Sequence, residues 1–160
     1  MDTYTLIHVL ISLVGIFTGF VVLWGFLTGN RLNNWTAVFL ATTVATSATG
    51  FGFPFERLLP SHKVGIISLV VLAVALFALY GRRMAGPWRK VFVVCAMLAQ
   101  YLNVFVAIVQ AFRNVPALKT LAPTQTETPF KVAQLVVLIL FIGVTIAAAR
   151  RFREKPAVAT

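Results

Sequence analysis

The sequence predicts an all-α integral membrane protein, a bundle of five transmembrane helices forming a single domain over residues 1–160. Of the 160 residues, 59% are hydrophobic and 11% are charged, and the mean hydropathy is +0.91. Soluble domains have about 25% charged residues, so this chain lacks the polar surface that water requires. The apolar excess lies in five stretches, each close to the length that a helix needs to cross a bilayer. These observations exclude a soluble enzyme, a disordered protein and a nucleic-acid-binding domain.

The five predicted spans follow from helix length and from residues typical of helix ends. A helix needs about 20 residues to cross roughly 30 Å of hydrocarbon. Asn34, Ser61, Pro87 and Pro129 stand before the second to fifth stretches, where N-caps and first-turn prolines are favoured. The predicted spans cover residues 5–27, 35–53, 64–80, 91–112 and 132–149.

The second and third spans differ most in polarity. The second contains hydroxyl residues along its whole length: Thr36, Thr42, Thr43, Thr46, Ser47 and Thr49. Hydroxyls in a helix bond back to backbone carbonyls, so lipid tolerates them better than amides or charges. Whether this segment spans the bilayer is the open question of the topology. The third span is nearly all apolar, and we expect it to be the most lipid-exposed of the five.

The distribution of Lys and Arg favours five spans over four. With five spans, nine basic residues share the side of the C-terminus and five lie on the other side. Without the second span, the split is eight to six. Because cytoplasmic loops carry the excess of Lys and Arg, we expect the N-terminus outside and the C-terminus in the cytoplasm. The nine are Arg31, Arg82, Arg83, Arg89, Lys90, Arg150, Arg151, Arg153 and Lys155.

This cytoplasmic collar accounts for most of the net charge of +10, which therefore does not indicate nucleic-acid binding. Such clusters also attract anionic lipid headgroups. The longest connection, residues 113–131, lies on the outer side in this topology and is expected to be a solvated cover of the helix pair rather than a ligand lid.

Polar residues within the spans are the candidates for packing and binding. The first span has His8, Ser12, Gly15 and Gly19 on one stripe, which includes a Gly-xxx-Gly pair typical of close helix packing. We expect this face to point into the bundle. Carboxylates all fall outside the spans, which disfavours an ion-coupled transporter.

Amides mark the last two spans. Gln100, Asn103 and Gln110 share one face of the fourth, and Gln134 lies in the fifth. Hydrogen bonds between helices are the favoured interpretation. The alternative is a pocket for a small or lipid-like ligand, for which the candidate residues are His8, Ser12, Asn103, Gln110 and Gln134.

The two histidines share one leaflet in the five-span topology. His8 lies about one turn from the outer surface, and His62 lies at the outer start of the third span. Neutral imidazoles ligate haem iron and other transition metals. Two hypotheses follow, a bis-histidine haem b site and a metal site of His8, His62 and a carboxylate. The competing interpretation is that His62 is an interfacial residue and that His8 bonds within the bundle.

Three segments resemble a known group of proteins. TSATGFGFPF (residues 46–55), VGIISLVVLAVALFALY (64–80) and LAQYLNVFVAIVQ (98–110) are similar to a family of small, uncharacterised multi-pass bacterial inner-membrane proteins. The resemblance covers nearly the whole chain. It implies the bacterial cytoplasmic membrane as the location and implies no activity, so no catalytic residue is transferred from it.

The leading functional hypothesis is a non-catalytic membrane protein that binds another membrane component, either as an accessory or assembly subunit or as a carrier of a lipophilic molecule. Its expected partners are membrane lipids and another membrane protein or a second copy of the chain, and it requires no cofactor. One alternative is a haem- or metal-binding redox subunit that uses His8 and His62. Another is a passive channel, lined by Thr42, Thr46, Gln100 and Asn103.

Overall fold

The computed structural model describes residues 3–53 and 60–153, and this part of the chain is helical without a strand. Short turns connect α1 to α2 and η1 to α4. The elements are α1 (Thr3–Thr28), α2 (Asn33–Gly50), α3 (Pro60–Leu76), a one-turn π-helix η1 (Phe77–Gly81) that extends α3, α4 (Trp88–Asn114), α5 (Pro116–Leu121) and α6 (Thr128–Arg151).

Four of these helices are long and apolar enough to cross a membrane: α1, the α3–η1 segment His62–Gly81, α4 and α6. The prediction of an all-helical membrane protein is confirmed at this level. Helix α2 is not among the four, because hydroxyl residues and two asparagines lower its hydropathy. Crossing of the bilayer by α2, and the orientation of the chain, therefore stay predictions.

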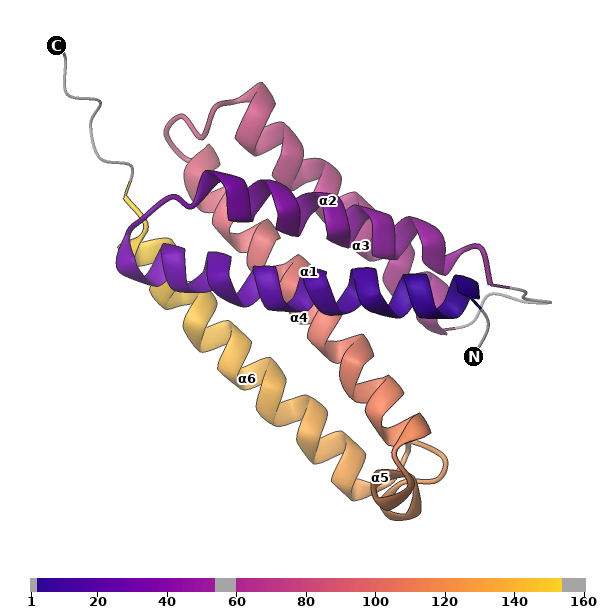
Figure 1. Ribbon diagram of the computed structural model, residues 1–160. Coiled ribbons are helices and arrows are strands. Elements are labelled where there is room, and N and C mark those ends of the chain that lie inside the picture. The colour runs from indigo at the N-terminus through magenta and orange to yellow at the C-terminus, as the bar shows by residue number, and fades with distance from the viewer. Residues whose placement is uncertain (1–2, 54–59, 154–160) are drawn as a thin grey trace, which may run out of the picture.

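The connection between α4 and α6, expected to be a solvated cover of the helix pair, has secondary structure of its own. It contains the short helix α5, which starts with Pro116 in its first turn, where the fixed φ of proline is favourable. Figure 1 shows α5 at the far end of the α4–α6 pair, on the same end of the molecule as the start of α1. The end of α6 and the end of α1 lie together at the opposite end.

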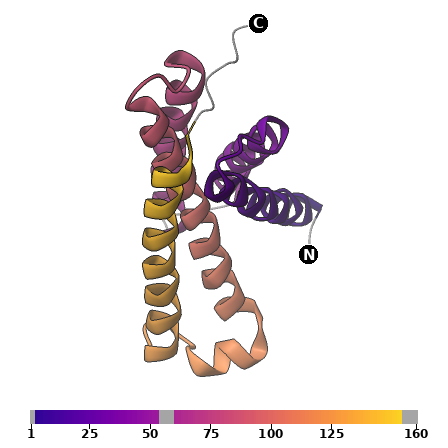
Figure 2. The ribbon, with the colours of Figure 1, turned by 90° about the vertical axis from the view of Figure 1, so that its left-hand side faces the viewer.

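Two helix pairs organise the bundle, α1 with α2 and α4 with α6, and α3 contacts one helix of each pair. Helix α1 packs most extensively on α2, α2 contacts α3, and α4 contacts α3, α1 and α6. Figure 2 shows that α1 and α2 run obliquely across α4 and α6 rather than parallel to them. The α4–α6 pair thus diverges from α1 toward the end that carries α5 (Figure 1).

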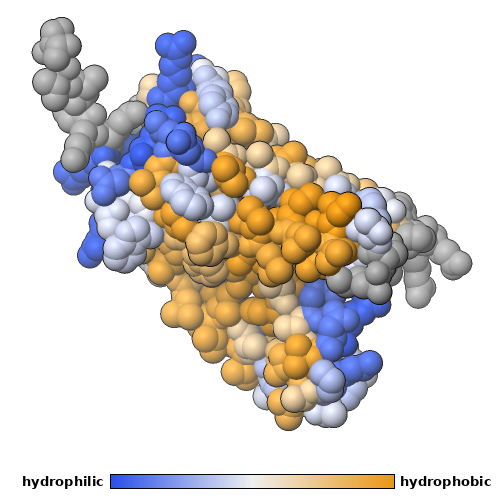
Figure 3. Space-filling view, viewed as in Figure 1, coloured by the Kyte–Doolittle hydropathy of each residue, from blue (hydrophilic) through white to orange (hydrophobic). Residues whose placement is uncertain are grey.

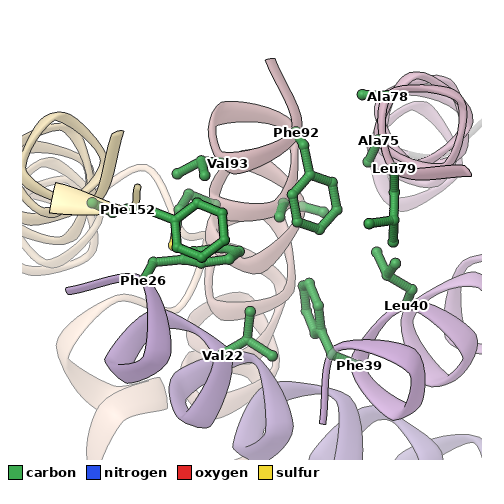
Figure 4. Close-up of a cluster of buried hydrophobic side chains, with 14 of the residues drawn as sticks. Val22, Phe26, Phe39, Leu40, Ala75, Ala78, Leu79, Phe92, Val93 and Phe152 are labelled. Carbon is green, nitrogen blue, oxygen red and sulfur yellow. The ribbon is translucent and has the colours of Figure 1, made fainter. Parts of the chain in front are cut away.

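The apolar core lies near the end where α1 and α6 finish. Phe26 packs its ring against Phe92 at 5.8 Å and against Phe152 at 4.8 Å, measured between ring centroids. Figure 4 shows Phe26, Phe92 and Phe152 with Val22 and Phe39 converging from different helices. Each of these five side chains is at most 1% exposed. Because Phe152 follows α6 directly, this contact fixes the end of α6 to α1 and α4.

Helix α6 is the least covered of the apolar helices. Only 11% of its most hydrophobic window is buried inside the protein, against 28% for the α3–η1 segment. The expectation that the third span is the most lipid-exposed is therefore wrong. The reason is the oblique packing, because α6 contacts α4 and the end of α1 but has no helix on its other side in the described part of the chain. Figure 3 shows the apolar surface that results.

Candidate functional site

The polar side chains of the described helices gather along the contact of α1, α2, α3 and α4. We call this contact the polar seam, defined by Gln100, Asn103, Thr43, Ser47 and Ser68. It lies beside and beyond the apolar core, toward the start of α1. Thr43 and Gln100 are fully buried, and Ser47 and Ser68 are buried as well. A seam of this kind requires each polar group to find a partner within the protein.

Gly15 and Gly19 form the α1 side of the seam, since both are buried. A Cβ atom at Gly15 would lie 3.3 Å from the Oγ1 atom of Thr42, and one at Gly19 would collide with the side-chain amide of Gln100. The missing side chains therefore let α2 and α4 approach α1 closely. This is the packing role expected for a Gly-xxx-Gly stripe.

Gln100 spans the interface between α4 and α1. Its Nε2 atom donates a hydrogen bond of 2.8 Å to the carbonyl oxygen of Ile16. Its Oε1 atom is enclosed against Gly19 and has no hydrogen-bond partner within the described residues. A Cα–H group is a weak donor that recurs at close helix contacts, and Gly19 offers one here. The amide thus joins two helices instead of lining an open space.

Asn103 continues this line one turn further along α4. Its Nδ2 atom donates to the Oγ1 atom of Thr43 at 3.1 Å, which joins α4 to α2. Ser47 on α2 in turn donates to the Oγ atom of Ser68 on α3 at 3.1 Å. The Ser47–Ser68 pair was absent from the sequence predictions, because no spacing rule relates residues on two different helices before their packing is known.

His8 lies between α1 and the end of α2. Its Nδ1 atom is 2.8 Å from the Oγ1 atom of Thr49, and its ring meets that of Phe53 edge-on at 5.0 Å. Tyr4 lies one turn before His8 on the same face of α1, and its hydroxyl donates a hydrogen bond of 2.5 Å to the backbone oxygen of Thr49. Ser12 does not join this group, because its hydroxyl donates to the backbone oxygen of His8 within α1.

His62 lies at the start of α3, only 4% exposed, with its ring centroid 5.7 Å from that of Phe51. The two histidines therefore flank residues 51–53, which follow α2. Within residues 3–53 and 60–153 no group of three His, Cys, Asp or Glu side chains is placed to hold a metal ion. Glu56, the carboxylate nearest to His62 in the sequence, lies outside the described residues. The haem b and metal hypotheses stay predictions.

The remaining amide candidates are separated from the seam. Gln110 is exposed near the end of α4, where its Oε1 atom accepts a hydrogen bond from Asn114. Gln134 on α6 donates to the backbone oxygen of Phe105 at 3.2 Å, which joins α6 to α4. The three amides of α4 were predicted to share one direction, but only Gln100 and Asn103 contact the α1–α2 pair.

The residues suggested for a channel contribute to helix packing. Thr42 donates back to the carbonyl oxygen of Val38 at 2.7 Å, as hydroxyls in membrane helices commonly do. Thr46 has an enclosed hydroxyl oxygen with no partner in the described part of the chain. Gln100 and Asn103 are joined to α1 and α2 as above. These contacts hold the helices together, and the polar seam as described contains no charged side chain.

No family model, curated protein or solved structure matches this chain.

Proposed function

We propose that the protein is a small non-catalytic protein of the inner membrane that binds another membrane component through the outward face of α2. The observation that carries this proposal is the two-sided character of α2. Its inward face carries Thr43 and Ser47, which are bonded to the bundle beside the core residue Phe39, whereas its outward face carries a line of small residues flanked by larger exposed side chains. The proposal includes five spans, with the N-terminus outside and the C-terminus in the cytoplasm.

The inward face of α2 is occupied. Thr36, Phe39, Leu40, Thr43 and Ser47 are its buried residues. Two of them, Thr43 and Ser47, hold the hydrogen bonds to α4 and α3. These contacts fix the rotation of α2 about its axis, so the residues on the opposite side are turned away from the bundle.

The outward face of α2 contains a line of alanines, with exposed Trp35 and Val38 beside it. Ala37, Ala41 and Ala48 are exposed, and Ala45 is half-buried. At 100° per residue, these four positions fall within an arc of about 80°. We call this surface the alanine face. Small residues at this spacing allow two helix backbones to approach closely, and they are enriched where membrane helices associate.

The low hydropathy of α2 favours contact of the alanine face with another protein helix over contact with lipid. A helix that is not apolar enough to span alone gains stability in the bilayer from contacts with protein. Alanine side chains present little apolar area to lipid, but their small size allows another helix to pack closely against α2. The Lys and Arg asymmetry supports the same topology, since it favours a membrane-crossing α2.

Site-specific photo-crosslinking in native membranes tests the proposal. A benzophenone amino acid replaces Ala41 on the alanine face, and Leu140, 60% exposed on α6, serves as the matched control. We expect an adduct of discrete protein mass from position 41, suppressed by the additional change Ala37→Trp, and none from position 140. The mass identifies a second copy or another protein. No adduct at position 41, or equal adducts at both positions, would contradict the proposal.

A further inference from the structure

The end of the α4–α6 pair contains a cavity that none of the preceding roles uses. Its volume is about 230 Å³, and it is lined by Phe112, Arg113, Lys119, Pro123, Thr124 and Gln125. Its lining residues come from the end of α4, from α5 and from the turn that leads to α6; Figure 1 shows where these segments lie. From this cavity we infer a binding site for a phosphate-type anion, the headgroup phosphate of a membrane phospholipid.

Charge is the first argument. Arg113 lies in the last turn of α4 and Lys119 in the last turn of α5, so two cations from different helices line one cavity. Both are exposed, and within the described part of the chain neither has an ion-pair partner. Arg presents a planar set of N–H donors that matches phosphate oxygens, and Lys adds a point charge.

The nearby carboxylate does not compensate these cations. Glu127 accepts hydrogen bonds from the backbone N–H and the hydroxyl of Thr124, at 3.1 and 2.8 Å, and from the backbone N–H of Thr126 at 3.0 Å. It also stands at the N-cap position of α6, where the helix dipole favours negative charge. Glu127 is therefore engaged in shaping the loop, which leaves Arg113 and Lys119 for an external anion.

The cavity is held in shape by contacts that do not involve an anion. Gln125 has a left-handed backbone conformation, with φ at 60°, and its Nε2 atom donates to the carbonyl oxygen of Val109 at 2.8 Å. Phe112, buried beneath the cavity, meets the ring of Phe130 edge-on at 5.4 Å. These contacts tie the loop to α4 and α4 to α6, so the site exists before a ligand arrives.

The neighbouring surface identifies a lipid as the source of the phosphate. On α6, Val132, Leu135, Val136 and Ile139 are each at least 50% exposed. They run from the α5 end along the apolar part of α6, the least covered helix. Figure 3 shows hydrophilic and apolar surface meeting at this end of the molecule. A phospholipid matches that order, with its phosphate at Arg113 and Lys119 and its acyl chains along α6.

Native mass spectrometry of the full-length protein in a neutral maltoside detergent tests the site with phosphatidylglycerol as the probe. The test variant is the double change Arg113→Gln and Lys119→Gln. The matched control is Lys63→Gln with Lys131→Gln, which removes two exposed cations that do not line the cavity and do not belong to the cytoplasmic collar. We expect affinity for the first lipid to fall by about 30-fold in the test variant, the loss typical of two cations near an anionic headgroup. The control should bind like the parent protein.

Two further measurements distinguish lipid phosphate from free phosphate and control for misfolding of the double Gln variant. Inorganic phosphate that displaces the lipid supports the same anion site and points to a free phosphate as its occupant, whereas phosphate that does not displace it supports the lipid. The charge-conserving pair Arg113→Lys and Lys119→Arg should restore binding if the double Gln variant is poorly folded. Equal loss in the test and control variants, parent-like affinity in the test variant, or no rescue in a folded charge-conserving variant would overturn the inference.

Discussion

The side-chain amide of Gln100 fills the space that Gly19 leaves open on α1, with Nε2 bonded to the carbonyl oxygen of Ile16 and Oε1 enclosed against Gly19. The two residues are on different helices, and each requires the other. Gly19 without the amide would leave a void between the helices, and the amide without the glycine would have no room. This pair is a specific contact at which stability can be tested.

Replacing Gly19 by Ala is expected to lower the free energy of unfolding by about 1–3 kcal/mol, because the displaced amide loses its hydrogen bond inside the protein. The matched control is Gly143→Ala on α6, where a Cβ atom would meet nothing within 4 Å. That change should be neutral or stabilising by at most about 1 kcal/mol, the difference in helix propensity. Unfolding in mixed detergent, followed by circular dichroism, gives both values. Similar values for the two variants would show that Gly19 has no special role.

The contact between Gly19 and Gln100 predicts that the stability losses caused by changes at these two positions are not additive. Gln100→Ala removes the side chain that an added methyl group at position 19 would meet, so Gly19→Ala should cost nothing further in that background. We expect a coupling energy of about 1–3 kcal/mol between positions 19 and 100 in a double-mutant cycle. The cycle uses the same unfolding measurement. Additive losses would mean that the two positions act independently.

The loop before α6 is expected to depend on pH through Glu127. Desolvation raises the pKa of Glu127, but hydrogen bonds from Thr124 and Thr126 outweigh it and hold the pKa below the ordinary value of 4.5. A lowered pKa in the folded state means that the stabilisation is present above pH 4.5 and is lost as the pH falls through the folded value. The protection factors of the Thr124 and Thr126 amide groups, which correct for the intrinsic slowing of exchange in acid, should therefore fall as the pH is lowered through the pKa of Glu127.

Glu127→Gln provides the control for this pH effect. The amide keeps one acceptor oxygen but does not titrate, so the variant should show weaker protection at neutral pH and no additional acid-dependent loss. A parent-like acid transition in the variant would assign the effect to another group.

Topology reporters test whether α2 crosses the membrane. With five spans, fusions after residues 30 and 85 lie in the cytoplasm, and a fusion after residue 120 lies outside. If α2 does not cross, the fusion after residue 30 moves to the outer side while that after residue 85 stays inside. Paired fluorescent-protein and phosphatase fusions report the two sides with opposite signals. Residues 30 and 85 on opposite faces would refute the five-span arrangement.

Hydropathy, helix-end residues and spacing identified the long helices correctly, and four of them meet the length and composition of a membrane span. These properties are local, since they depend on the bilayer as solvent and on neighbouring residues along one helix. The same local reasoning identified Gly15 and Gly19 as a packing stripe. It did not find α5, because a six-residue helix has too little periodicity to stand out in a loop.

Only the tertiary structure decided which helices meet and at what angle. The oblique crossing of α1 and α2 over α4 and α6 left α6 the least covered apolar helix, turned Gln100 and Asn103 toward α1 and α2, and brought Arg113 and Lys119 to one cavity. Helices in lipid have similar apolar surfaces, so the hydrophobic effect does not select their neighbours. Close contacts at small residues and interhelical hydrogen bonds select them, and these contacts exist only between helices that have already packed.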